Sequence, residues 1–145
     1  KIGTPNGISS LDEISLGGLK QWIFIRAEDQ NNPILLFLHG GPGEPMGGIP
    51  SSRINDAELI KYFTMVHWDQ RGAGKSYNSK IPTNSMSHDR LVEDCKELID
   101  YLQNRFGAQK VFLVAHSGGT PIGLKTAYTY PEKIHAYVGV AQIVN

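Results

Sequence analysis

The stretch of this sequence that most constrains its fold is Lys110–Thr120, which reads KVFLVAHSGGT. Its apolar run, Val111–Ala115, has the length and composition of a strand buried on both faces of a sheet. Small residues lie two positions before and two positions after Ser117, at Ala115 and Gly119. They permit a sharp strand-to-helix turn, typical of a nucleophile elbow that raises a serine hydroxyl above the sheet. An ordinary loop with a helix-capping serine is the alternative reading.

The composition fits one globular domain without a polyanionic partner. The chain has 145 residues, of which 40% are hydrophobic and 9% aromatic, enough for a core of its own. Lys and Arg number 14, as do Asp and Glu, and no segment concentrates basic residues. We therefore expect no nucleic-acid partner. The single cysteine, Cys95, lies at helical spacing from Leu91 and Leu98, which predicts a buried apolar role rather than a catalytic one.

No apolar run approaches the roughly 20 residues that a membrane-spanning helix needs. We expect a cytoplasmic protein, although the sequence starts at Lys1 without methionine and leaves open an upstream anchor or signal. The histidines show no metal-ligand spacing. His39, His67 and His116 sit at predicted strand ends, where packed or hydrogen-bonded imidazoles are usual. We expect no metal and no cofactor.

Apolar periodicity predicts alternating strands and helices along the rest of the chain. Strands are expected at 11–16, 19–26, 34–38, 63–68 and 134–144, and helices at 55–62, 87–106 and 120–130. The first two strands meet at a double glycine suited to a hairpin turn. The first helix would be capped by Asn55 or Asp56, and the longest would begin at Ser87 and end near Gly107. This order predicts an α/β fold: a mostly parallel sheet with helices on both faces.

Three glycine-rich loops follow three predicted strands: HGGPG at 39–43, DQRGAGKS at 69–76 and HSGGT at 116–120. In an open parallel sheet such loops share one crevice, so a serine and several free backbone amides would come together. The end of the second loop, GKS, looks like part of a phosphate-binding P-loop. That pattern needs a glycine where Asp69 stands, and a carboxylate there would repel phosphate.

In this order, the segments LLFLHGGPG, VHWDQRGAGKSY and FLVAHSGG closely resemble the proline iminopeptidase-like branch of the α/β-hydrolase superfamily. The resemblance spans nearly the whole chain. It implies an α/β-hydrolase fold, with Ser117 as nucleophile and the backbone amides of Gly41 and Gly118 as oxyanion hole. It also implies a small peptide, amide or ester substrate. For HGGPG alone, an ordinary tight turn is the alternative.

The resemblance extends to Asp69 and Arg71, which we expect to brace neighbouring loops rather than touch substrate. Because the two side chains are close in sequence, we expect them to satisfy each other and nearby carbonyls. The chain departs from the usual family pattern at Ala115, Gly118 and Thr120, where glycine, tryptophan and serine are common. Loss of the tryptophan removes a wall of the acyl pocket, which predicts altered substrate preference more than lost chemistry.

Length is the larger departure from the resemblance. The superfamily's triad runs Ser, then Asp or Glu, then His, but after Ser117 this chain offers only Glu132 and His135. A helix roughly 18 Å long separates them from the elbow, whereas a base must come within about 3 Å of the hydroxyl. We therefore expect residues 1–145 to be the N-terminal part of a single α/β-hydrolase domain, truncated before the cap and the C-terminal strands. Alone, it should be inactive and should self-associate through an exposed sheet edge.

Three functions remain open from the sequence. The first is a serine hydrolase fragment, most simply an aminopeptidase, that acts through an acyl-enzyme on Ser117. The second is an esterase or lactonase with the same machinery, because the choice of scissile bond depends mainly on the absent cap. The third is a non-catalytic binding or remnant domain, suggested by the missing acid and base and the unusual elbow.

Overall fold

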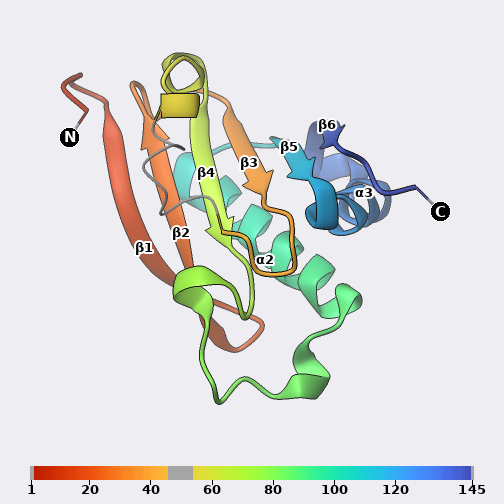
Figure 1. The fold of residues 1–145 in the computed structure, drawn as a ribbon. Coiled ribbons are helices and arrows are strands. Elements are labelled where there is room, and N and C mark those ends of the chain that lie inside the picture. Colours follow the sequence, from red (N-terminus) through yellow and green to blue (C-terminus); the bar gives the residue numbers. More distant parts are fainter. Residues whose placement is uncertain (1, 46–53, 145) are drawn as a thin grey trace.

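A computed structural model describes residues 2–45 and 54–144, which form a six-stranded mixed sheet (Figure 1). The strands are β1 (Ile8–Leu16), β2 (Leu19–Ala27), β3 (Ile34–Leu38), β4 (Thr64–Asp69), β5 (Val111–His116) and β6 (Ile134–Val140). Their order in the sheet is β1-β2-β4-β3-β5-β6. β1, β2 and β4 pair antiparallel, whereas β4, β3, β5 and β6 run parallel. The predicted α/β class is confirmed.

The β1–β2 hairpin forms where the double glycine predicts it. Gly17 and Gly18 have φ values of 54° and 74°, and Leu16 pairs with Leu19 across them. Two successive residues with positive φ are what a type I′ turn requires, and glycine meets that requirement without strain. The turn therefore fixes the register in which β2 presents Ile23 and Ile25 to the core, where both are fully buried.

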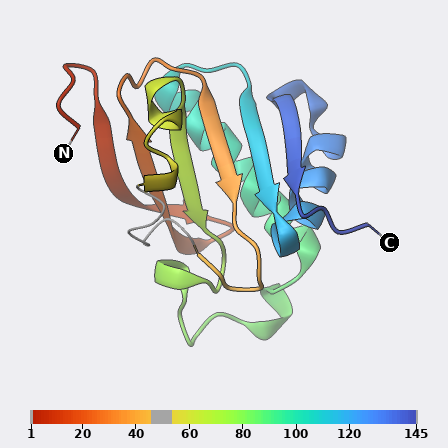
Figure 2. The same ribbon diagram turned by 45° about the horizontal axis from the view of Figure 1, so that its top comes forward.

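Both long helices cover the same face of the sheet. α2 (His88–Phe106) runs behind the strands in Figure 1 and Figure 2, and α3 (Thr120–Thr129) packs against α2, β5 and β6 at the right-hand edge. Ser87 caps α2 by accepting the Arg90 N–H at 3.1 Å, and Gly107 ends it, as predicted. The buried stripe of α2 consists of Val92, Cys95, Leu98, Ile99 and Leu102. Burying each large apolar side chain contributes roughly 2 kcal/mol. Among the described helices, none combines the length and the apolar character needed to cross a bilayer.

The opposite face carries a much shorter helical segment. Residues 54–55 are helical and a 3-10 helix, η1 (Leu59–Lys61), follows them. Ile60 of η1 packs with Leu35 and Met65 in a second, smaller apolar cluster. The predicted pattern of helices on both faces therefore holds, although the predicted helix at 55–62 is only partly regular.

The predicted cap of that short helix is wrong. Asp56 does not cap η1, whose N-cap residue is Glu58. Instead the buried Asp56 carboxylate pairs with Nε2 of His67, at 2.6 Å. His67 lies within β4 rather than at its end. A local cap pattern could not reveal this pair, because the partner belongs to the next strand.

The last strand is shorter than the predicted 134–144. β6 ends at Val140, and the next residue, Ala141, has a φ of 51°, which turns the chain away from the strand direction. The following residues bond back to α3 and β6. Ile143 N–H donates to Thr120 Oγ1 at 3.0 Å, and Tyr137 Oη lies 2.8 Å from Gln142 Oε1.

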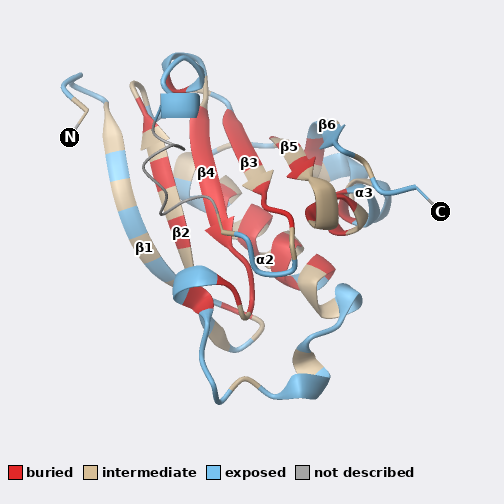
Figure 3. Cartoon of the chain, in the orientation of Figure 1, coloured by how far each residue is buried: buried red, intermediate tan, exposed pale blue. Residues whose placement is uncertain are grey.

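The sheet order places the three glycine-rich loops together. β3 lies between β4 and β5, so the chain leaves β3 toward one side and later returns to the other. In open α/β sheets, the carboxyl ends of the strands at such a reversal form the usual ligand crevice. Figure 3 shows that the strands leading into it, β4 and β3, are also among the most buried elements. Two of the three glycine-rich loops therefore follow the buried central strands of the sheet.

Candidate active site

Ser117 occupies a strained turn between β5 and α3. Its φ is 47°, a left-handed value that residues with a Cβ rarely adopt and that costs of order 1–3 kcal/mol. A 3-10 turn, η4 (Ser117–Gly119), leads directly into α3, and Thr120 Oγ1 donates to the Ser117 carbonyl oxygen at 2.6 Å. Ser117 is not a capping residue, because the N-cap positions of η4 and α3 are His116 and Gly119. The strand-to-helix turn has the geometry of an elbow.

The HGGPG loop lies directly against this turn. A Cβ added to Gly40 would lie 3.1 Å from the Ser117 Cβ. A Cβ added to Gly118 would overlap the Gly41 carbonyl oxygen and lie 3.1 Å from the Gly41 nitrogen. Gly41 itself has a φ of 110°, where an L side chain is disfavoured. The structure thus brings together Ser117 and the backbone of Gly41 and Gly118, the residues that the resemblance singles out.

The close approach at Gly118 bears on the missing tryptophan. Any side chain at this position would meet the Gly41 carbonyl group, so the HGGPG loop could not keep its present place. The HGGPG loop can therefore pack this closely against the elbow only because residue 118 has no Cβ. This is a physical reason for the departure from the usual family pattern.

His39 links the HGGPG loop to the loop that follows β4. Its Nε2 accepts the backbone N–H of Gln70 at 3.2 Å, and the Gln70 side-chain amide donates to the His39 carbonyl oxygen at 2.9 Å. Both residues are buried, and burial lowers the pKa of His39 below its ordinary value. Sequence reasoning missed Gln70, although its place inside the DQRG segment was a usable signal.

Asp69 and Arg71 do not pair with each other, so that expectation is wrong. Asp69 Oδ2 accepts the Lys75 N–H at 2.8 Å, while its buried Oδ1 has no hydrogen-bond partner among the described residues. Burial raises the pKa of Asp69. The Arg71 guanidinium points instead toward α2, where Nε and Nη2 donate to both oxygens of Asp94 at 2.8 and 3.1 Å.

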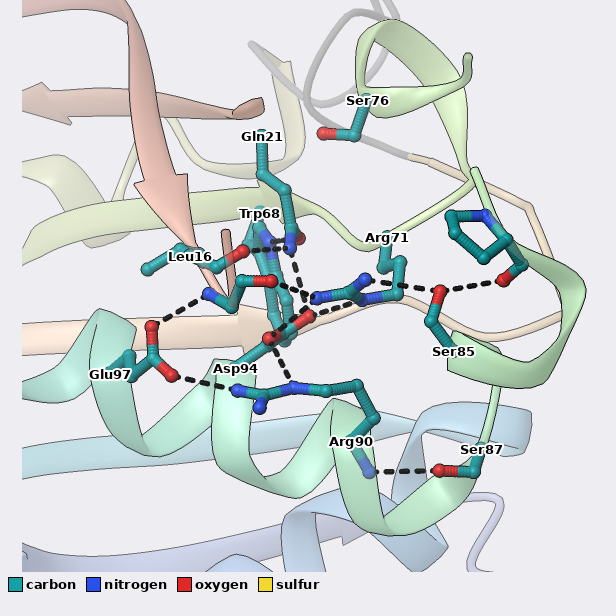
Figure 4. Close-up of polar contacts among 12 residues, drawn as sticks. Leu16, Gln21, Trp68, Arg71, Ser76, Ser85, Ser87, Arg90, Asp94 and Glu97 are labelled. Atoms are coloured by element: carbon teal, nitrogen blue, oxygen red, sulfur yellow. Dashed lines mark hydrogen bonds and ion pairs between the residues drawn. The ribbon is translucent and has the colours of Figure 1, made fainter. Parts of the chain in front are cut away.

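Asp94 is the centre of a buried polar network (Figure 4). Its carboxylate is fully buried and also accepts from Arg90 Nε and Gln21 Nε2, each at 2.9 Å. Arg71 extends the network by donating to the Gly17 carbonyl oxygen at 3.2 Å. The β1–β2 turn, α2 and the loop after β4 are therefore tied to one carboxylate. Sequence reasoning missed Asp94. The usable signal was its position: Asp94 is next to Cys95 and four residues before Leu98, so this acidic residue lies on the apolar stripe of the helix.

Glu132 and His135 lie far from the elbow, as expected. β5 and β6 pair in parallel, with Val111 opposite Ile134, so His135 is at the start of β6 while Ser117 follows the end of β5. Five residues of strand at about 3.3 Å each separate those levels by on the order of 16 Å. The His135 ring stacks on Phe112 at 5.0 Å. Within residues 2–45 and 54–144, no histidine hydrogen-bonds the Ser117 hydroxyl.

The chain is similar to known hydrolases over most of its length. Residues 60–145 match the family described as serine aminopeptidase, S33. The probable aminopeptidase YbaC of Bacillus subtilis (strain 168) is 40% identical over 144 residues, which are 99% of this chain and 45% of that protein. The proline iminopeptidase of Neisseria gonorrhoeae is 32% identical over 114 residues, or 77% of this chain and 34% of that protein.

Solved structures show the same fold. A proline iminopeptidase-related protein from Thermus thermophilus superposes with a TM-score of 0.76 at 25% identity, covering 95% of this chain and 46% of that one. An epoxide hydrolase from Vigna radiata gives 0.73 at 31% identity, covering 90% and 39%. The chain thus spans less than half the length of each of these relatives. It belongs to the serine aminopeptidase S33 family and has the α/β-hydrolase fold that the three ordered loops implied.

Proposed function

We propose that this chain is the nucleophile-bearing part of a serine hydrolase that works through an acyl-enzyme on Ser117. The carrying observation is the strained φ of 47° at Ser117, on a turn that packs against the HGGPG loop. In the proposed reaction the Ser117 hydroxyl attacks the acyl carbonyl and its proton passes to a base. The leaving group departs with a proton, and water then releases the acyl group.

Two backbone amides would stabilise the tetrahedral intermediates of this reaction. The N–H groups of Gly41 and Gly118 come from the loop after β3 and from the elbow itself, whose backbones are in contact. Preorganised donors of this kind need no rearrangement as negative charge develops on the oxygen, and each contributes roughly 3 kcal/mol to the transition state. Asp69 and Arg71 then have a supporting role, since they anchor the loop after β4 that holds His39.

The acid and the base of the reaction would come from outside the 145 residues. A serine hydroxyl is a poor nucleophile at neutral pH without an adjacent base. Glu132 and His135 stand at the opposite end of the parallel strands. We therefore propose that the chain is the N-terminal part of a longer hydrolase domain and has negligible activity alone. A fluorophosphonate probe should label Ser117 slowly or not at all in the 145-residue chain, and rapid labelling would contradict this.

The relatives favour a substrate with an amide bond after a free N-terminal residue. Relatives named as a probable aminopeptidase and a proline iminopeptidase match with 40% and 32% identity. We propose a small peptide or amide substrate on this basis. An esterase or lactonase reaction uses the same serine and oxyanion hole, and epoxide hydrolases share the fold.

The test is turnover by the complete protein on a panel of aminoacyl amides, including prolyl amides, acyl esters, lactones and epoxides. We expect the highest kcat/KM with an aminoacyl amide and a loss on the order of a thousandfold or more in Ser117→Ala. The matched control is Ser79→Ala, which changes an exposed serine in the loop after β4 and should keep full activity. Undiminished turnover by Ser117→Ala would exclude the mechanism, and no turnover on any substrate would favour a non-catalytic remnant.

We also propose that the chain self-associates through β6. This strand lies at the end of the sheet order, so one of its edges is unpaired among the described residues, and Val138 and Val140 are exposed on it. Sedimentation of the 145-residue chain should show a fraction of dimer that increases with protein concentration. Val138→Lys should lower this fraction. A clean monomer at high concentration would contradict this proposal.

A further inference from the structure

The direction of the Gly41 N–H depends on the carbonyl group of Gly40. The two groups belong to one peptide unit, and the described residues contain no cis peptide bond. In a planar trans peptide the C=O and the N–H point in opposite directions. Any contact that fixes the Gly40 oxygen therefore also aims the Gly41 N–H. Nδ1 of His39 lies 2.8 Å from that oxygen, and the Glu44 N–H approaches it at 3.4 Å.

The hydrogen bonds around His39 determine which of its ring nitrogens carries the proton. Nε2 faces the backbone N–H of Gln70 at 3.2 Å and must therefore accept, which requires an unprotonated Nε2. In a neutral ring the proton then sits on Nδ1, which donates to the Gly40 oxygen. The second contact, from the Gln70 side-chain amide to the His39 carbonyl oxygen at 2.9 Å, holds the backbone of His39 in place.

The surroundings of His39 keep this arrangement intact. His39 and Gln70 are 3% and 6% exposed, so water competes little for their hydrogen bonds. Burial lowers the pKa of His39, and the nearby His67 acts in the same direction. Together they outweigh the Gly40 carbonyl group and the carboxylates of Asp69 and Glu44, which raise this pKa. The ring is therefore neutral at physiological pH. A second proton, on Nε2, would face the Gln70 N–H and break the contact.

We propose that His39, held by Gln70 as its Nδ1–H tautomer, is a positioning residue that orients the Gly40–Gly41 peptide against the Ser117 turn. This inference rests on the proposed function, because the orientation affects catalysis only if the Gly41 N–H stabilises an oxyanion. His39 itself touches no reacting atom. It acts through the peptide plane, and its effect belongs to the transition state rather than to substrate binding.

The first test is ¹⁵N NMR of the imidazole rings in the 145-residue chain. We expect His39 to show a protonated Nδ1 and an acceptor Nε2 at neutral pH, with an Nε2 resonance that shifts in Gln70→Ala. The exposed His88 and His135 provide the spectra of solvent-accessible imidazoles for comparison. An Nε2–H tautomer at His39, or a doubly protonated His39 ring at neutral pH, would overturn the proposal. This readout needs no catalytic activity.

The second test compares kcat and KM in the complete protein. His39→Leu removes the donor to the Gly40 oxygen, and we expect a ten- to hundredfold loss of kcat with little change of KM. His39→Asn places an amide N–H near the position of Nδ1 and should therefore have a higher kcat than His39→Leu. If His39→Leu fails to fold, the kcat of His39→Asn still tests the proposal. His135→Gln is the matched control and should leave both constants unchanged.

The two tests separate failure of this inference from failure of the proposed function. Retained turnover in Ser117→Ala would remove the proposed reaction, while the NMR result would still report the His39–Gln70 contact. If Ser117→Ala is inactive but His39→Asn and His39→Leu both keep the kcat of the unchanged protein, the nucleophile stands and the positioning role is wrong.

Discussion

The buried carboxylate of Asp94 should be one of the most sensitive positions in the chain, and Asp94→Asn tests this with a nearly isosteric change. Asp94 is fully buried and accepts four N–H groups, from Arg71 Nε and Nη2, Arg90 Nε and Gln21 Nε2. An asparagine offers one oxygen to these donors and presents its own N–H₂ group to the others. The Arg71 guanidinium, whose side chain is 2% exposed, then loses its counter-charge inside the protein.

The magnitude follows from the contacts that are lost. A hydrogen bond to a charged group contributes about 1.5–3 kcal/mol, and at least one donor of Arg71 would lose its acceptor. Breaking a buried ion pair by removing one partner typically costs about 3–5 kcal/mol, because the remaining charge stays buried. We therefore expect Asp94→Asn to lower the free energy of unfolding by about 3–5 kcal/mol. That is a large share of the stability of a domain of this size.

Urea unfolding of the 145-residue chain, followed by circular dichroism, measures this difference. The matched control is Asp89→Asn, the same substitution on the same helix. The Asp89 side chain is 79% exposed and pairs only with Lys125 among the described residues. It should leave the urea midpoint close to that of the unchanged protein, because exposed ion pairs contribute little. A cost of less than about 1 kcal/mol for Asp94→Asn, or one no larger than that of Asp89→Asn, would contradict this expectation.

Three further predictions use single residues of the described structure. Burial raises the pKa of the Cys95 thiol to about 12, so iodoacetamide should modify it only after unfolding, and rapid modification of the folded chain would contradict this. Because burial lowers the pKa of His39, this residue holds more protons in the unfolded chain than in the folded chain below about pH 6.5. The contribution of His39 to stability should therefore be complete above that pH and decrease below it, and thermal unfolding followed against pH should show a smaller decrease in His39→Asn. Gly118→Ala should lower the free energy of unfolding by about 1–3 kcal/mol, because its Cβ overlaps the Gly41 carbonyl oxygen, whereas Gly3→Ala, with open space around it, should be near neutral in the same urea assay.

The regular elements could be predicted because their signals are local. The double glycine at Gly17, the five apolar residues that form β3 and the capped stripe of α2 each specify structure within a few residues. The elbow was predictable for the same reason, since Ala115 and Gly119 lie within two residues of Ser117. Loop order along the chain then predicted one crevice, because parallel strands deliver their carboxyl ends to one edge.

The pairing of polar side chains could not be predicted, because it depends on the tertiary fold. Arg71 is two residues from Asp69 yet binds Asp94, twenty-three positions away, since the loop after β4 turns its guanidinium toward α2. Asp56 looks like a helix cap and instead meets His67 across the second face of the sheet. In both cases a buried charged group needs a hydrogen-bonding partner, and the tertiary fold determines which partner lies close enough.

The central claim is that Ser117 carries the acyl group, and covalent labelling of the complete protein tests it most directly. A proline-derived phosphonate should form a single adduct, and peptide mass spectrometry should locate it on Ser117, in the segment that spans 111–125. Ser117→Ala should remove the adduct and the turnover together, while Ser79→Ala should keep both. An adduct on any other residue, with turnover that survives Ser117→Ala, would contradict the account.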